Sequence, residues 1–126
     1  MNPGKTLRIN AIFRKADGKS VIVAIDHGGI AGPIQGIHKP APLIQSCLKG
    51  GADAILTTRG FVKASIEEWD RGMSLILRLT GGFTTLGGKF EEEMISSPET
   101  ALLYGACGAA VTVKFGHPRE GEFTRQ

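Results

Sequence analysis

The sequence lacks the features that mark several large classes of protein. No apolar run approaches the ~20 residues that a membrane span requires, and Met1 to Thr6 are not followed by a signal-peptide stretch. Neither Cys47 nor Cys107 has a CxxC partner. Both cysteines fit small core residues in a reducing compartment. We therefore expect a cytoplasmic protein with no membrane partner.

The chain is also poor in aromatic residues, which make up 6% of it, and its 15 Lys and Arg residues are scattered. A nucleic-acid-binding domain gathers its basic residues or interleaves them with aromatics, so we expect no nucleic-acid partner. The net charge of +3 fits a mildly basic domain, or a site for a phosphorylated or carboxylated anion. No ligand spacing around His117 matches a metal site, and we expect no metal.

What the chain does have is 18 glycines and an alternation of short apolar runs with helical patterns, within 126 residues. We predict strands over 20–25, 52–58, 74–79 and 109–115. We predict helices over 40–49, 65–71 and 98–104, with a short leading helix or cap within 7–19 and a small hairpin within 83–90. This order predicts a parallel sheet with right-handed crossovers.

Polar residues close each predicted strand at its carboxyl end: Asp26 and His27, then Thr58 and Arg59, then Thr80, and finally Lys114. The glycines after the first strand do not match the G-x-G-x-x-G loop of a dinucleotide-binding fold. Barrel enzymes keep their chemistry at the carboxyl ends of the strands, and a whole barrel needs ~250 residues. We therefore expect an α/β chain that forms, as one domain over 1–126, the first half of a (β/α)₈ barrel. An open flavodoxin-like domain that binds a small anion is the alternative.

Four residues are candidates for the chemistry. Asp26 and His27 are proton-transfer groups at the mouth of a buried strand, although Asp26 also suits a cap on the following loop. Arg59 suits a substrate anion or a surface ion pair. Lys114 suits a solvated or substrate-facing cation, with a nucleophilic role as the less favoured alternative. We expect the Glu91–Glu93 run to form a solvated face or to begin a helix.

The run Val21 to Gly28, which ends in Asp-His-Gly, is followed by Gly32-Pro33 and the residues up to Ile37. With the later Gly50 to Ala54, Arg59-Gly60 and Leu75 to Gly82, it resembles the archaeal-type (DhnA-type) class I fructose-bisphosphate aldolases of the DeoC/LacD family. The same pattern is similar to that of the related 2-amino-3,7-dideoxy-heptulosonate synthases and autoinducer-2 phosphate thiolases.

The resemblance implies a Schiff-base lyase that acts on a phosphorylated ketose such as fructose 1,6-bisphosphate, or on a related keto substrate, without a cofactor or a metal. Asp26 matches the family's acidic residue at the end of the first strand, which positions and protonates the substrate. The family's lysine on the sixth strand, its tyrosine after the fourth strand and its phosphate-binding turns have no counterpart here. Lys114 lies at the end of the fourth predicted strand, not on the sixth, and does not match that lysine.

Two other functions stay open. One is a transferase of the heptulosonate-synthase or thiolase type. The other is a non-catalytic half-barrel that assembles with a second copy or with a missing C-terminal half. Its first and fourth strands would have open edges, and open edges invite pairing.

Overall fold

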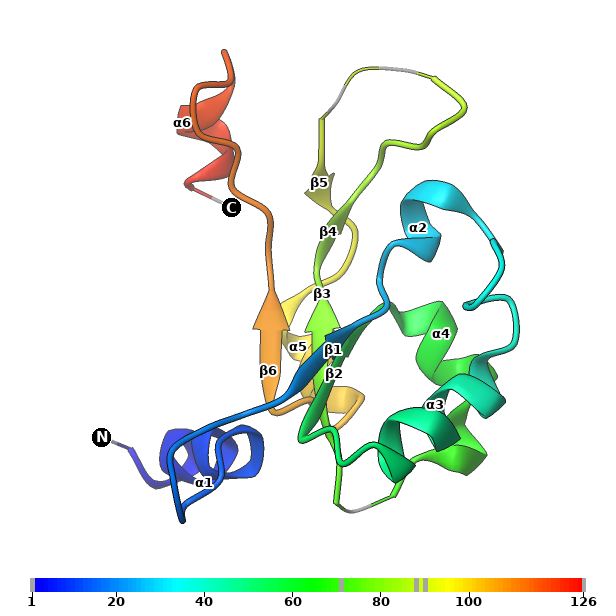
Figure 1. Ribbon diagram of the computed structural model, residues 1–126. Coiled ribbons are helices and arrows are strands. Elements are labelled where there is room, and N and C mark those ends of the chain that lie inside the picture. The colour runs from blue at the N-terminus through cyan, green and yellow to red at the C-terminus, as the bar shows by residue number, and fades with distance from the viewer. Residues whose placement is uncertain (1, 71, 88, 90, 126) are drawn as a thin grey trace.

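A four-stranded parallel sheet forms the centre of the computed structural model, which describes residues 2–70, 72–87, 89 and 91–125. Its strands lie in the order β1 (Ile22–Ala24), β2 (Ala54–Thr57), β3 (Ser74–Arg78) and β6 (Gly108–Ala110) (Figure 1). The predicted strands are present, but the fourth was expected to reach residue 115. It ends at Ala110, because the Thr112 amide donates to the Thr80 hydroxyl (3.0 Å) and not to a strand backbone.

Helices alternate with the strands, and some of them begin at a capping side chain. They are α1 (Pro3–Ile12), α2 (Gly28–Ala31), α3 (Pro40–Lys49), α4 (Arg59–Ala64), the 3₁₀ turn η1 (Ile66–Glu68), α5 (Pro98–Leu103) and α6 (Glu120–Phe123). Asn2, Thr58 and Ser97 each accept a backbone N–H of the first turn that follows.

Two helices begin earlier in the chain than the sequence predicts. The leading helix starts at Pro3, before the predicted range of 7–19, because Asn2 and Pro3 supply a cap and a first-turn proline. The helix predicted over 65–71 is wrong: α4 begins at Arg59 behind the Thr58 cap, and only the short turn η1 lies within 65–71. Arg71, the end of that prediction, lies outside the described residues.

A small antiparallel pair rises from the carboxyl end of β3. It joins β4 (Thr80–Gly81) to β5 (Glu93–Met94), so it is wider than the hairpin predicted within 83–90, where Gly88 and Phe90 lie outside the described residues. A Cβ on Gly81 would lie 2.8 Å from the Ile95 side chain. Glycine therefore lets the two arms approach closely.

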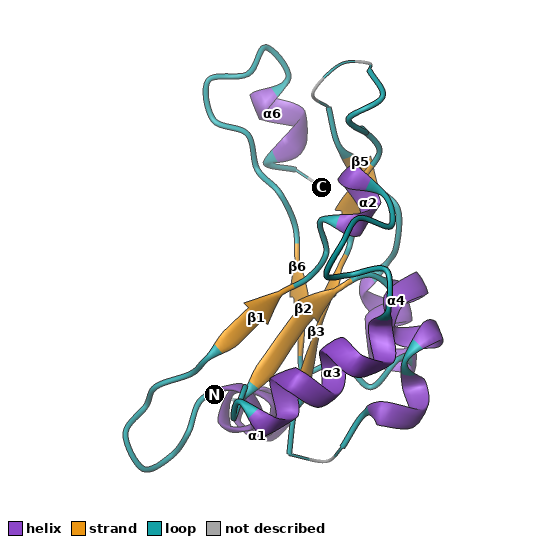
Figure 2. Cartoon of the chain, turned by 45° about the vertical axis from the view of Figure 1, so that its right-hand side comes forward, coloured by secondary structure: helices purple, strands orange, loops and turns teal. Residues whose placement is uncertain are grey.

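The core lies between the sheet and the helices α3, α4 and α5 (Figure 2). Ile55 of β2 packs with Ile44 and Cys47 of α3, and Leu77 of β3 packs with Val62 of α4 and with Ala101. Because side chains alternate along a strand, the residues between them face the opposite side of the sheet. Helix α1 crosses the amino-terminal end, where the Ser74 hydroxyl donates to the Ala11 carbonyl (2.7 Å).

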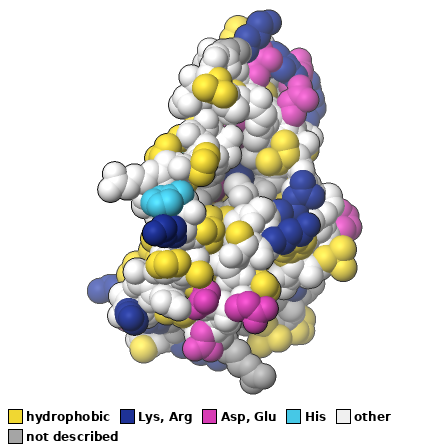
Figure 3. Space-filling model, turned by 90° about the vertical axis from the view of Figure 1, so that its right-hand side faces the viewer, with side chains coloured by type: hydrophobic (Ala, Val, Ile, Leu, Met, Phe, Trp, Pro, Cys, Tyr) yellow, Lys and Arg dark blue, Asp and Glu magenta, His cyan; other side chains and the backbone are white. Residues whose placement is uncertain are grey.

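Within the part of the chain that the structure describes, the sheet has two unpaired edges, because β1 pairs only with β2 and β6 only with β3. Apolar side chains at these edges are exposed: Ile22 is 43% exposed and Val111 is 50% exposed. On the face in Figure 3, the Lys and Arg side chains lie in separate small groups, some beside acidic ones. Among the described residues, no helix is long and apolar enough to span a membrane.

Candidate functional site at the carboxyl end of the sheet

The strand register brings side chains from separate strands to one end of the sheet. Ala24, Leu56, Ile76 and Gly108 are neighbours in one row across the four strands. Two residues further along each strand stand Asp26, Thr58, Arg78 and Ala110. Alternate residues of a strand share a face, so Arg78 and Ala110 lie on the side of the sheet opposite the helices. Asp26 follows the end of β1 and meets Arg78 there, whereas Thr58 follows β2 and caps α4.

Arg78 is the centre of this row. Its Nη1 donates to Asp26 Oδ2 (2.8 Å) and its Nη2 donates to Glu92 Oε2 (2.7 Å). Nη2 also donates to the Thr112 hydroxyl, and Nε donates to the Thr80 carbonyl and hydroxyl oxygens, both at 3.1 Å. The side chains of Arg78 and Asp26 are each 18% exposed. One guanidinium thus connects groups that follow β1, β3 and β6 with the segment just before β5.

Glu92 is a buried carboxylate, with 5% of its side chain exposed. Burial alone raises the pKa of this group. Hydrogen bonds from Arg78 and from the Thr80 hydroxyl (2.8 Å) outweigh burial and hold the pKa of Glu92 below its usual value. The expectation of a solvated face or helix start at 91–93 is therefore wrong for Glu92, because Arg78 pairs it inside the molecule.

Lys114 is also buried, at 9% exposure, despite its charge. Its ammonium lies 4.7 Å from the centre of the Phe83 ring and 5.9 Å from that of Phe123. Such distances are favourable for a cation–π interaction. Phe83 follows β4 and Phe123 belongs to α6, so Lys114 connects the two segments that stand beyond the sheet.

Arg119 holds those two segments together from the outside. It pairs with Glu91 (2.9 Å) and Glu93 (3.4 Å) on the β5 side and with Glu122 of α6 (2.7 Å). Hydrogen bonds from Arg119 lower the pKa of Glu122. In Figures 1 and 2, α6 and the β4–β5 pair both stand beyond the carboxyl end of the sheet.

The other two predicted site residues do not join the cluster around Arg78. His27 is exposed and precedes α2 without a capping bond from its side chain. Arg59 is exposed at the start of α4 and donates to the Ile95 carbonyl (3.0 Å), a contact with its own chain. The structure therefore brings Asp26 together with Arg78 and Glu92, two residues that the sequence analysis did not select.

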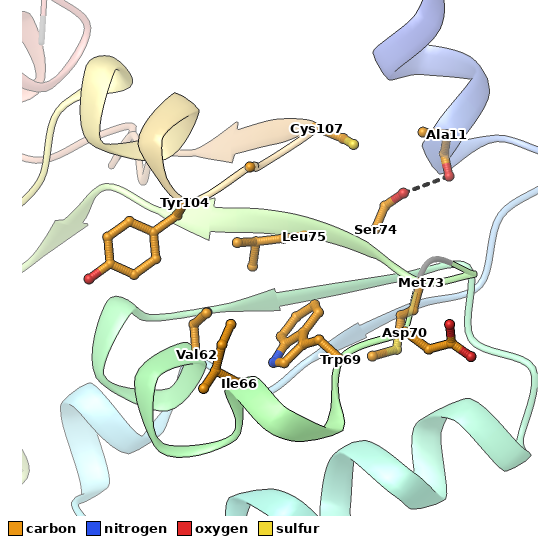
Figure 4. A pocket seen from close by; sticks show the side chains of 11 residues that line it. Ala11, Val62, Ile66, Trp69, Asp70, Met73, Ser74, Leu75, Tyr104 and Cys107 are labelled. Atoms are coloured by element: carbon orange, nitrogen blue, oxygen red, sulfur yellow. Dashed lines mark hydrogen bonds between the residues drawn. The ribbon is translucent and has the colours of Figure 1, made fainter.

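A separate cavity of about 300 Å³ lies near the other end of the sheet, between η1 and α5 (Figure 4). Its wall is mostly apolar, and the indole of Trp69 points toward Leu75 of β3. The Trp69 indole N–H donates to the Ser65 hydroxyl (3.1 Å). Among the described residues, no group of three His, Cys, Asp or Glu side chains is arranged to hold a metal.

The cluster around Arg78 is suited to proton transfer. A carboxyl group held by one oxygen, beside a fixed cation, can accept or return a proton at its other oxygen. Lys114 places a second cation at the same end of the sheet. Acid–base chemistry on an anionic substrate is therefore within the reach of these residue types.

Comparison with known proteins agrees with this placement. The chain is 33% identical over 75 residues to an uncharacterised aldolase of Saccharolobus solfataricus, an alignment that spans 59% of this chain and 27% of that protein. It is 28% identical over 121 residues to the 3-hydroxy-5-phosphonooxypentane-2,4-dione thiolase of Escherichia coli, across 93% of this chain and 40% of that enzyme.

Solved structures give the same result. The fold matches a Schiff-base-forming fructose-1,6-bisphosphate aldolase with a TM-score of 0.78 and 28% identity, over 96% of this chain and 49% of that one. An archaeal fructose-1,6-bisphosphate aldolase, solved with its catalytic lysine bound to the carbinolamine intermediate of its substrate, matches equally well. The chain thus spans about half the length of these aldolases, and its strands and helices correspond to part of a TIM-barrel aldolase, as the sequence predicted. The DeoC/LacD aldolase family pattern matches residues 20–126, and the chain belongs to that family.

Proposed function

We propose that residues 1–126 supply, as one domain, the first half of a class I aldolase barrel that acts on a phosphorylated ketose through a Schiff base. The observation that carries the proposal is Asp26. It stands at the carboxyl end of β1, where barrel enzymes keep their chemistry, and Arg78 holds one of its oxygens at 2.8 Å. The lysine that forms the Schiff base would come from the second half.

The proposed roles follow from position. Asp26 positions the substrate and exchanges a proton with it. Lys114, buried at the same end of the sheet, interacts with an anionic group of the substrate. His27 and Arg59 stay in the proposal at the rim, where exposed side chains can meet a substrate as it enters. No metal or cofactor is needed, because an imine supplies the electron sink for carbon–carbon cleavage.

Fructose 1,6-bisphosphate is the proposed substrate, since two of the matching structures are aldolases for that sugar. The thiolase from Escherichia coli supports the alternative, a transferase acting on a different phosphorylated keto compound.

The test uses the longest polypeptide that contains this chain as its source cell makes it. We expect cleavage of fructose 1,6-bisphosphate, and irreversible loss of activity when sodium borohydride is added together with that substrate. Peptide mass spectrometry should place the reduced adduct on a lysine outside residues 1–126. If the enzyme still cleaves the substrate at an unchanged rate after borohydride treatment, that result would contradict the Schiff-base mechanism.

The second candidate is a half-barrel whose role is assembly. The unpaired edges of β1 and β6 favour it, together with the exposed Ile22 and Val111 beside them. The occupant would be a second copy or a separate C-terminal half. Partner pairing would cover these apolar side chains, in the way that barrels remove all edges by closure.

Light scattering on the 126-residue chain tests this candidate. We expect self-association or a broad melting transition, and Val111→Lys should shift the chain toward monomer by placing a charge at the β6 edge. Leu86→Lys, at a side chain 96% exposed on the β4–β5 loop, is the matched control and should leave the association unchanged. A monomer with a sharp transition would rule out assembly through these edges.

A further inference from the structure

Arg78 uses all of its hydrogen-bonding nitrogens within the protein. Nε faces the two Thr80 oxygens, Nη1 faces Asp26, and Nη2 faces Glu92 and Thr112. An arginine that binds a substrate phosphate needs a free edge of its planar guanidinium. Among the described residues, a single Nη1 N–H of Arg78 is without an acceptor, so no edge with two open N–H groups is left for a phosphate. The role of Arg78 must therefore concern the groups that it already holds.

The charges of the cluster are unequal. Two carboxyl groups, Asp26 and Glu92, share the single guanidinium of Arg78. An anion placed beside this cluster would be repelled by the surplus carboxylate. The phosphate groups of a substrate are therefore expected to lie away from it, and the substrate's uncharged carbon chain to lie against it.

Asp26 is held on one side only. Its Oδ2 accepts from Arg78 Nη1, and no described residue donates to its Oδ1. One fixed oxygen and one open oxygen define the rotation of the carboxyl group. Arg78 meets this carboxyl group through one N–H, and its other partners fix the plane of the guanidinium. The direction of that N–H is therefore set more sharply than the direction of a lysine ammonium, which is a point charge on a flexible stem.

Glu92 in turn fixes Arg78. Glu92 is 5% exposed and also accepts from the Thr80 hydroxyl (2.8 Å), so its own position is set by β4. Glu92 therefore holds Arg78, and Arg78 holds Asp26, each through a charge-assisted hydrogen bond.

We propose that Arg78 is the positioning residue for Asp26, and that Glu92 orients Arg78 for that task. This inference rests on the proposed function of Asp26. It adds two residues that do not themselves touch the substrate, and it assigns the open Oδ1 of Asp26 as the oxygen that meets the substrate.

The test in the complete protein combines kinetics with chemical rescue. Arg78→Lys should lower kcat by about 10²-fold, as expected for a catalytic group shifted by about 1 Å, and should leave KM nearly unchanged. Arg78→Ala should lose activity and regain part of it in millimolar guanidinium chloride, but not in equimolar ammonium chloride. Arg14→Ala, which removes a guanidinium from Asp53 at the other end of the sheet, is the control. It should show neither effect.

Two results would overturn the proposal: an Arg78→Lys enzyme with wild-type kcat, or an Arg78→Ala enzyme that folds and is not rescued by guanidinium. Should Arg78→Ala fail to fold, Glu92→Gln replaces it. Glu92→Gln should lower kcat with little change in KM, and wild-type kcat would count against the role of Glu92.

A carboxyl ¹³C NMR experiment on the complete protein separates this proposal from the proposed function. Arg78→Lys and Glu92→Gln should both move the Asp26 Cγ resonance, and Arg14→Lys should not. A complete protein without aldolase activity would refute the proposed function, yet the Asp26 resonance would still report on the contact. An unmoved resonance would overturn the positioning role by itself.

Discussion

The two ends of the sheet each carry an arginine paired with an aspartate, yet the pairs are built differently. At the amino end, Asp53 Oδ2 accepts from the Val21 amide (2.7 Å) and from Arg14 Nη1 (3.2 Å), and the Arg14 side chain is 43% exposed. At the carboxyl end, Asp26 has no backbone donor to its carboxyl group among the described residues, and its partner Arg78 is 18% exposed.

The difference separates a structural pair from a candidate catalytic one. The Asp53 carboxylate holds the chain that leads into β1, and its bond to a backbone amide accounts for its position. The Asp26 carboxyl group has one open oxygen, shares its arginine with Glu92, and stands at the end of the sheet where barrel chemistry takes place.

The largest effect is expected from removing the carboxylate itself. In the complete protein, Asp26→Asn should reduce turnover of fructose 1,6-bisphosphate by about 10²–10⁴-fold, the range for a lost proton-transfer group. Asp53→Asn keeps a carbonyl oxygen for the Val21 amide and should leave turnover per folded molecule close to wild type. Steady-state assays measure the turnover of both variants. An equal loss of turnover in the two would mean that the two aspartates do not differ in function.

The next effect concerns stability. Arg78→Met leaves two largely buried carboxyl groups without their cation, so we expect it to lower the free energy of unfolding by about 3–5 kcal/mol. Arg14→Met breaks a more exposed pair and should cost about 1 kcal/mol or less. Urea titration of the complete protein measures both. A cost for Arg78→Met as small as that for Arg14→Met would mean that solvent reaches the cluster more freely than its burial indicates.

The sequence predicted much of this fold but only part of the site. Buried strands, the proline that opens α3 and the Ser97 cap are local signals, and each corresponds to an observed element. Asp26 was found because it directly follows an apolar strand. The start of α4 has a weaker local signal: Thr58 fits the end of a strand as well as a helix cap, and Trp69, the main apolar residue of the region, lies after α4 and next to η1.

A different reason explains why the sequence alone did not indicate Arg78 and Glu92. Arg78 stands within an apolar strand, where its side chain faces away from the helices and meets residues up to 52 positions distant. Glu92 sits in a run of three glutamates, and only the fold distinguishes it: Arg119 pairs with Glu91 and Glu93 outside, whereas Arg78 pairs with Glu92 inside. Alternation along β3 puts Arg78 on the same face as Ser74 and Ile76, a signal that could have identified it.

A smaller effect is expected in the pH dependence of stability. The folded pKa of Glu92 lies below its unfolded value of about 4.3. In the interval between the two values the unfolded chain binds more protons, so stability rises with pH there. The contribution of Glu92 is thus present above the unfolded pKa and lost as the pH falls through the folded pKa.

We therefore expect wild type to lose its advantage over Glu92→Gln as the pH is lowered from about 5 through the unfolded value of about 4.3 and then through the folded pKa of Glu92, in urea titrations at closely spaced pH values. The same titrations on Asp53→Asn give the reference for a carboxyl group at the amino end of the sheet. A constant difference between wild type and Glu92→Gln across this range would contradict a lowered pKa for Glu92.

The smallest effect is expected where α1 meets the amino end of the sheet. Ile12 is the buried residue of α1, whereas Leu7 is 71% exposed, so the Ser74 hydroxyl bond to the Ala11 carbonyl is a main tie between this helix and β3. Ser74→Ala should lower the free energy of unfolding by about 1 kcal/mol, the usual net value of one hydrogen bond.

Ser46→Ala removes a hydroxyl bond to the Pro42 carbonyl within α3 itself and is the control. Hydrogen exchange should show faster exchange of the α1 amides in Ser74→Ala alone. The backbone amides of the residues around Arg78 should exchange as slowly as in the wild type. Equal exchange in both variants would mean that Ile12, and not the hydroxyl bond, holds α1 against the sheet.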